Sequence, residues 1–154
     1  MPELGRAVGA ELLTPTRVYA ADILDLLGSG LDVHALSHVT GGGLAANLAR
    51  VLPAGLRIDV DRTTWSPAPV FGLVAELGQV PQDDLERTLN MGVGMLAVVP
   101  ADAVDATVAR LAARDLVAWA CGEVRTDDGT PREHESRGAK GVDGGTVALV
   151  GDYR

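Results

Sequence analysis

Residues 33–60 read VHALSHVTGGGLAANLARVLPAGLRIDV, and this stretch decides the fold. The mostly apolar residues 33–39 predict a short strand, and residues 44–52, which end before Pro53, predict a short helix. Residues 56–60 alternate apolar and polar side chains, which predicts a second strand with one face in water. A strand, a helix and a strand in succession form the basic unit of a layered α/β protein.

The segments on either side continue this alternation. A helix is predicted to start at Thr14-Pro15 and to stop at Gly28, because Thr caps helices and Pro suits the first helical position. The other predicted elements are helices at 69–78 and 81–89, a central strand at 93–99, a helix capped by Asp102, a strand at 117–124 and an edge strand at 146–150. We therefore predict an α/β domain over 1–125, a flexible, polar, acidic loop over 126–145, and an edge strand with a tail over 146–154.

Composition narrows the function classes. The chain has 154 residues, enough for one domain, and a net charge of −8 from 21 acidic and 13 basic residues. This charge argues against nucleic acid as a partner. The one cysteine, Cys121, permits neither an intrachain disulfide nor a cysteine zinc cage. No apolar run is long enough for a membrane helix, and the start lacks the pattern of a secretory signal, so we expect a cytoplasmic protein without a membrane partner.

The triplet Gly41-Gly42-Gly43, between a predicted strand and a predicted helix, is the strongest candidate for a binding site. Glycines let the backbone approach a ligand, and the amides at a helix start suit a phosphate group. His38 and Thr40 flank the triplet and can bond to the same ligand. A tight structural turn with a packed histidine explains the same residues, and residue type alone leaves both explanations open.

Two further patterns are candidates for ligand binding. The spacing Gly41-x-Gly43-x-x-Ala46, with Asp61 twenty positions after Gly41, fits a loose nicotinamide-dinucleotide fingerprint, but the intervening helix is short. In Asn90-Met91-Gly92, the glycine leaves space for a ligand or another backbone, and Asn90 offers a donor and an acceptor. The histidines show no metal-binding pattern, so no metal site is predicted.

Four blocks occur together and in order: LLTPTRVY (12–19), HALSHVTGGGLAANLARVLPAGL (34–56), TWSPAPVFGLV (64–74) and TLNMGVGMLAVVP (88–100). In this combination the chain resembles the C-terminal half of the aminoimidazole ribonucleotide synthetase family, also called phosphoribosylformylglycinamidine cyclo-ligase. The resemblance covers roughly residues 10–125. It implies a three-layer, mixed-sheet α/β domain with partial ferredoxin-like topology.

The resemblance also implies a function. Family members are ligases of purine biosynthesis that use ATP and Mg²⁺ to close the ring of formylglycinamidine ribonucleotide, releasing ADP and phosphate. By this resemblance His38 is the expected catalytic residue, and Thr40, Gly41, Gly42, Gly43, Asn90, Gly92 and Arg17 are the expected contacts to substrate or phosphate. Much of the ATP site belongs to an N-terminal half that this sequence lacks, so we expect inactivity alone.

Partners and alternatives follow from the missing half. The expected partners are an N-terminal half or a second copy of the chain. Related two-domain ATP-dependent enzymes, such as selenophosphate synthetase and thiamine-monophosphate kinase, share the architecture and are one alternative. A non-catalytic ligand-binding module that retains the fold is another.

Overall fold

The computed structural model describes residues 2–138 and 143–154, in which helices and strands alternate largely as predicted. The helices are α1 (Val8–Leu12), α2 (Ala20–Leu27), α3 (Gly43–Ala49), α4 (Pro69–Gly78), α5 (Gln82–Thr88) and α6 (Val104–Ala112). Short 3-10 turns cover Pro2–Leu4, Arg62–Thr64 and Ala101–Ala103. The strands are β1 (Ala35–His38), β2 (Leu56–Asp61), β3 (Met95–Val98), β4 (Gly122–Thr126), β5 (Glu135–Arg137) and β6 (Thr146–Val150).

The strands form two sheets, one of four strands in the order β4-β2-β6-β5 and one of the pair β1-β3. In the larger sheet β2 and β6 are parallel, with Ile58 opposite Val147, whereas β4 and β5 are antiparallel to their neighbours. In the smaller sheet β1 and β3 are antiparallel, with His38 opposite Met95. The larger sheet therefore has the mixed strand directions that the resemblance implied.

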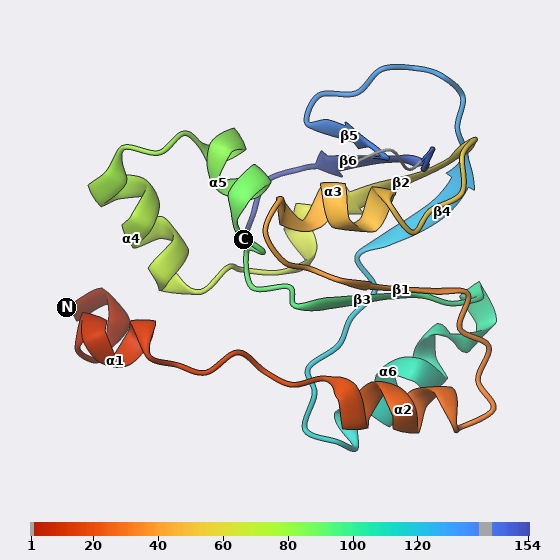
Figure 1. Cartoon of the computed structure of the whole chain (residues 1–154), viewed down its shortest axis with the longest axis horizontal. Coiled ribbons are helices and arrows are strands. Elements are labelled where there is room, and N and C mark those ends of the chain that lie inside the picture. The colour runs from red at the N-terminus through yellow and green to blue at the C-terminus, as the bar shows by residue number, and fades with distance from the viewer. Residues whose placement is uncertain (1, 139–142) are drawn as a thin grey trace.

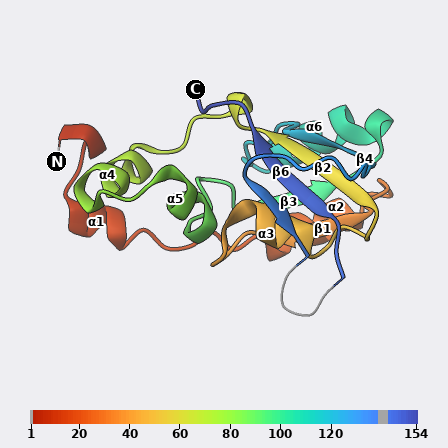
Figure 2. The same ribbon diagram turned by 90° about the horizontal axis from the view of Figure 1, so that it is seen from above.

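Helix α3 lies between the two sheets and fills the core. Its buried residues Leu44, Leu48 and Ala49 belong to one apolar cluster with Ile58 of β2 and Val147 of β6. Figure 1 shows α3 between the four-stranded sheet and the β1-β3 pair, with α2 and α6 beyond that pair. Figure 2, seen from above, shows α1 and α4 at one end of the molecule and α5 between them and α3. The predicted α/β class is confirmed.

The predicted start of the first helix is wrong. Residues 14–19 are extended, and α2 begins only at Ala20. The Thr14 hydroxyl donates to the Ala10 carbonyl of α1 and accepts from Arg6, so it does not cap a following helix. Asp102 likewise does not cap α6, because it lies in a 3-10 turn and the helix begins after Ala103 with no side-chain cap.

The strand predictions also need correction. Only the second half of the predicted strand at 117–124 forms β4, since residues 117–121 have no strand pairing. Strand β6 was predicted at a sheet edge, but it lies between β2 and β5 with its first four residues buried. Conversely, β3 was predicted to be central and has β1 as its partner strand in the described part of the chain.

The segment predicted as a polar loop, 126–145, contributes β5 to the larger sheet. Its first residues are also held in place, since Asp127 accepts a hydrogen bond from Thr146 Oγ1 at 2.8 Å and forms an ion pair with Arg57. Residues 139–142 of this prediction lie outside the described residues. In the described chain no helix has the length and apolar character needed to cross a membrane.

Candidate functional site

The glycine turn, residues 40–43, connects the end of β1 to the start of α3 as predicted. Gly42 and Gly43 have φ values of 102° and 75°, a region that favours glycine. Asn47 of α3 holds the turn, because its Nδ2 donates to the carbonyls of Gly43 at 2.6 Å and Thr40 at 3.3 Å. Thr40 and Gly41 are exposed, so the turn faces solvent on one side.

Helix α5 packs directly against the glycine turn. A Cβ atom added to Gly43 would lie 1.8 Å from the carbonyl oxygen of Glu86, closer than any real contact. Gly43 is itself buried, whereas Gly41 has open space around it. The third glycine therefore has a packing role, and the first two are the ones available to a ligand.

A second turn, at residues 90–92, stands beside the first. The Asn90 side chain accepts from the Gly92 amide at 3.0 Å, and its carbonyl accepts from the Val93 amide at 2.9 Å. The Val39 amide donates to the Gly94 carbonyl at 2.9 Å, which fixes the end of β1 next to this turn. The structure thus brings His38 and Thr40 near Asn90 and Gly92, although the Asn90 side-chain oxygen is engaged within its own turn.

His38 is exposed at the end of β1, and its ring meets Tyr19 edge to face, with centroids 6.0 Å apart. The Tyr19 hydroxyl lies over Gly94, where a Cβ would be 2.0 Å from it. Tyr19 therefore lies beside the candidate site. Sequence reasoning missed it, because the first predicted helix includes this residue. Tyr19 is recognised only by its position beside His38 in the structure, because no sequence motif marks it.

Arg17 is not placed as predicted. It lies in the extended segment before α2 rather than on a helix, and its Nη2 is 3.5 Å from the Asp22 carboxylate. This pairing holds the guanidinium at the start of α2. The described contacts do not join Arg17 to the glycine turn.

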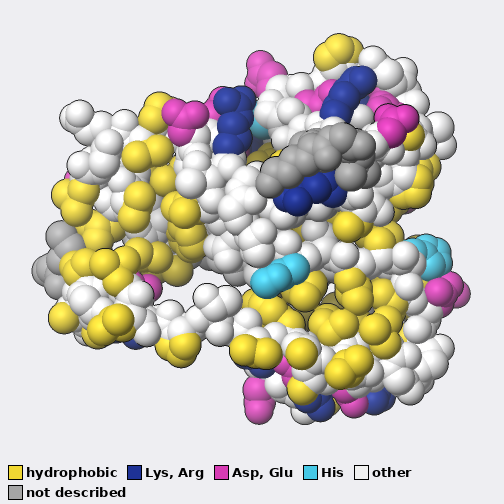
Figure 3. Space-filling model, in the orientation of Figure 1, with side chains coloured by type: hydrophobic (Ala, Val, Ile, Leu, Met, Phe, Trp, Pro, Cys, Tyr) yellow, Lys and Arg dark blue, Asp and Glu magenta, His cyan; other side chains and the backbone are white. Residues whose placement is uncertain are grey.

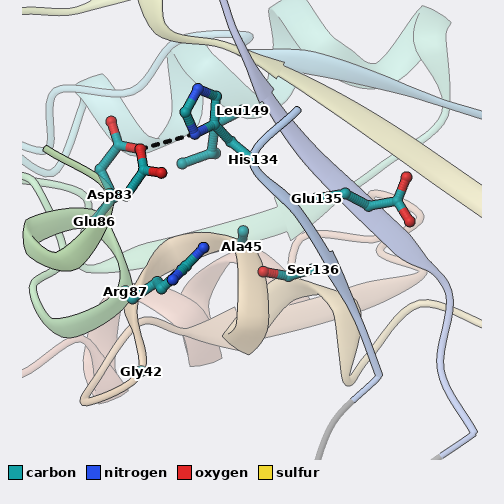
Figure 4. Close-up of a pocket in the computed structure, with 9 residues that line it drawn as sticks. All are labelled: Gly42, Ala45, Asp83, Glu86, Arg87, His134, Glu135, Ser136 and Leu149. Atoms are coloured by element: carbon teal, nitrogen blue, oxygen red, sulfur yellow. Dashed lines mark ion pairs between the residues drawn. The ribbon is translucent and has the colours of Figure 1, made fainter. Parts of the chain in front are cut away.

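A small polar pocket of about 30 Å³ opens beside Gly42, between α3, α5 and the start of β5. Figure 4 shows Arg87 of α5 extending toward Ser136 across the start of α3. Within the described residues Arg87 has no hydrogen-bond or ion-pair partner, so its charge is available to a ligand. The residues that line the pocket are Gly42, Ala45, Asp83, Glu86, Arg87, His134, Glu135, Ser136 and Leu149.

The same pocket holds three groups that could bind a metal ion. Ligand atoms of Asp83, Glu86 and His134 lie within 4.8 Å of one another, and His134 Nδ1 is 2.9 Å from Asp83 Oδ1. The Glu86 carboxylate, however, is buried and already pairs with Arg62 Nη1 at 2.9 Å. That cation neutralises the carboxylate that a metal would need. Sequence reasoning missed this group because His134 lies far along the chain from Asp83 and Glu86, which share helix α5.

Behind the pocket, Arg62, Glu86 and Tyr153 form a buried polar cluster. The Arg62 guanidinium lies over the Tyr153 ring at 5.7 Å from its centroid. Burial, together with the negative charge of Glu86, raises the pKa of Tyr153 above its usual range. The cluster therefore ties α5 to the end of β2 and to the C-terminal segment.

Comparison with known proteins identifies the family. Residues 2–133 match the family described as AIR synthase related protein, C-terminal domain. The chain belongs to this family. The match confirms the resemblance inferred from the four sequence blocks. Two of these blocks contain the glycine turn and the 90–92 turn, which lie next to each other in the structure.

Three relatives show how much of a longer protein the domain represents. A provisionally named phosphoribosylformylglycinamidine cyclo-ligase of Streptomyces fradiae is 55% identical over 99% of this chain and 78% of its own length. Phosphoribosylformylglycinamidine cyclo-ligases of Parasynechococcus marenigrum and an Anaeromyxobacter species are each 45% identical, over 74% and 81% of this chain. The chain spans only 33% and 36% of those two proteins.

Proposed function

We propose that this chain is the C-terminal part of an ATP-dependent phosphoribosylformylglycinamidine cyclo-ligase and that it acts together with a segment corresponding to the rest of the longer relatives. The observation that carries the proposal is the family match over residues 2–133, together with relatives of that name at 45–55% identity. The reaction phosphorylates the formyl oxygen of formylglycinamidine ribonucleotide with ATP. A substrate nitrogen then attacks the activated carbon, the ring closes and phosphate leaves.

The proposed contribution of this domain is to hold the phosphorylated substrate. The exposed turn of Thr40, Gly41 and Gly42 supplies backbone amides and a hydroxyl, and Arg87 supplies an unpaired positive charge nearby. His38 stands at the end of β1, where it can reach a substrate bound on the turn. Holding both reacting ends makes the ring closure effectively intramolecular, which is the main advantage an enzyme offers such a step.

ATP and Mg²⁺ fit this part of the chain poorly. A magnesium ion prefers several carboxylate or phosphate oxygens, and in the described residues the one candidate group is Asp83, Glu86 and His134. The ion pair between Glu86 and Arg62 reduces the charge of that group. We therefore propose that the metal–nucleotide site lies mostly in the segment that the longer relatives add.

The test is ATP-dependent formation of aminoimidazole ribonucleotide. The chain is assayed alone and after mixing with the part of the Anaeromyxobacter relative that it does not match, with the full relative as positive control. We expect activity only in the mixture. His38→Ala should lower the rate by at least about tenfold, as expected for loss of a group that moves a proton. His34→Ala is the matched control, because His34 is exposed before β1 and pairs with Asp32.

Each outcome has a distinct meaning. Activity of the chain alone would contradict the need for a second segment. Absence of activity in the mixture, while the full relative turns over, would contradict the catalytic proposal. The alternative in that case is a ligand-binding module, for which substrate binding without turnover is the expected result.

A further inference from the structure

A second, larger cavity lies away from the glycine turn. It has a volume of about 460 Å³ and lies between the β1-β3 pair, β2, and helices α2 and α6. Its walls include Ile23 and Leu26 of α2, Val108 and Leu111 of α6, and the continuous stretches 92–99 and 116–124. Figure 3 shows apolar side chains gathered on the part of the surface where Figure 1 places β1, β3 and α2. Small-molecule sites typically have volumes of about 300–1,000 Å³.

The cavity runs along two segments without strand partners on that side. Strand β3 pairs with β1 within the described chain. Residues 117–121 form no strand although their sequence predicts one, and in this stretch the Cys121 carbonyl accepts a hydrogen bond from the Asp61 amide of β2 at 2.7 Å. The cavity is open to solvent on one side, since the lining residue Val117 is 87% exposed. A contiguous apolar patch that faces solvent commonly marks a binding site.

One polar group in the wall lacks a partner. Thr107 of α6 is 5% exposed and lines the cavity, and its Oγ1 makes no hydrogen bond to any described residue. Buried hydroxyls are nearly always paired, since an unsatisfied one is costly. A hydroxyl donates and accepts, so a bound molecule with either kind of group would satisfy it.

The charges around the cavity restrict the ligand. Glu123 is the charged residue among those that line it, and its side chain is 72% exposed and pairs with Arg125 at the surface. Cys121 is also in the wall, and burial raises the pKa of its thiol, which keeps it neutral. No described lining residue offers a cation to an anionic ligand, so phosphorylated molecules suit this cavity poorly.

We propose that this cavity binds an uncharged, mainly apolar small molecule with one polar group that pairs with Thr107 Oγ1, and 2-naphthol serves as a probe of that chemistry. The cavity includes no residue of the glycine turn, and the proposal does not rest on the proposed ligase function. The cavity shares Tyr19 and Gly92 with the surroundings of the candidate site, but most of its lining comes from α2, α6, β3 and residues 116–121.

The test measures binding of 2-naphthol and of naphthalene to the full chain by calorimetry and by quenching of Trp119, which lines the cavity. We expect both to bind. Thr107→Val keeps the shape and removes the hydroxyl, so it should weaken 2-naphthol binding by about tenfold, the effect of one hydrogen bond, and leave naphthalene binding unchanged. A failure of both probes to bind the wild-type chain would overturn the proposal, as would an equal loss of both in Thr107→Val.

A second pair of variants separates the cavity from the rest of the surface. Ala118 lines the cavity, so Ala118→Phe should occupy part of it and weaken binding of both probes. Ala112→Phe is the matched control, because Ala112 is exposed on α6 and does not line the cavity. Circular dichroism of each variant checks that it folds. Binding of both probes that is unchanged in folded Ala118→Phe would place them elsewhere and overturn the assignment.

Discussion

Gly43 is the point at which the glycine turn, α3 and α5 meet, and Gly43→Ala tests that packing. Its φ is 75°, and a side chain in this region costs about 1–2 kcal/mol. A Cβ would also lie 1.8 Å from the Glu86 carbonyl oxygen and 3.2 Å from Arg87 Cα, and moving α5 away costs about 1–3 kcal/mol. The smaller entropy of the unfolded alanine chain returns only about 0.4–1 kcal/mol. We therefore expect the free energy of unfolding to fall by about 3 kcal/mol.

Urea titration and thermal melting measure this change. For a chain of this length the expected decrease in Tm is about 6–12 °C. Gly41→Ala is the matched control two residues away, since its φ is ordinary and a Cβ there would meet no atom within 4 Å. We expect Gly41→Ala to change the free energy of unfolding by no more than about 0.5 kcal/mol. Equal losses in the two variants would refute the assignment of a packing role to Gly43 alone.

Three further changes test the buried and paired charges. Arg62→Met leaves Glu86 buried without its cation, so the free energy of unfolding in urea should fall by about 3–5 kcal/mol. Burial raises the pKa of Tyr153, so its contribution to stability is complete below about pH 10 and is lost as the pH rises further; Tyr153→Phe should flatten this loss in thermal melts. The Gly129 amide holds the pKa of Asp127 below its usual 3.8, so stability present above pH 3.8 is lost as the pH falls further, and Asp127→Asn should remove that acid sensitivity.

The sequence predicts local elements well where one period dominates. Helix α4 begins at Pro69 and ends at Gly78 as expected, because Pro suits the first helical position. The left-handed residue that follows its end is Gln79, with φ 49°, rather than the glycine. Strand β6 shows what a local pattern misses. Its residues after Thr146 are all apolar, which is typical of a strand covered on both faces, yet its position near the end of the chain favours an edge. Only the pairing with β2 and β5, which are distant in sequence, makes it central.

The strand prediction for residues 117–121 is wrong for a different reason. Their composition suits a strand, but β strands require a partner, and β4 pairs with β2 only from Gly122 onward. Gly122 permits this approach, because a Cβ there would lie 2.7 Å from the Asp59 carbonyl oxygen. The preceding residues diverge from β2 and line the large cavity. Local propensity therefore predicts that a segment can form a strand, whereas the available partner determines where the strand starts.

The candidate site was predictable in its backbone and not in its side chains. The glycine turn and the 90–92 turn were both recognised from their glycines, which carry the positive φ values that such turns require. Asn47, which holds the first turn, lies on a helix face where nothing in the sequence separates it from a surface residue. Arg87 was not selected either, since a single arginine on a polar helix is ordinary.

The contact at Gly43 explains why these residues form one unit. Because Gly43 has no side chain, the backbone of α5 rests directly on the glycine turn, and the next residue, Arg87, is held beside Gly42. The ion pair between Arg62 and Glu86 fixes α5 from its other side to the end of β2. A ligand on the turn would therefore meet a cation whose helix is held by both sheets. Arg87 is distant from the glycine turn in the sequence and lies beside it only in the folded chain. The positive charge in this pocket therefore could not be predicted from the sequence.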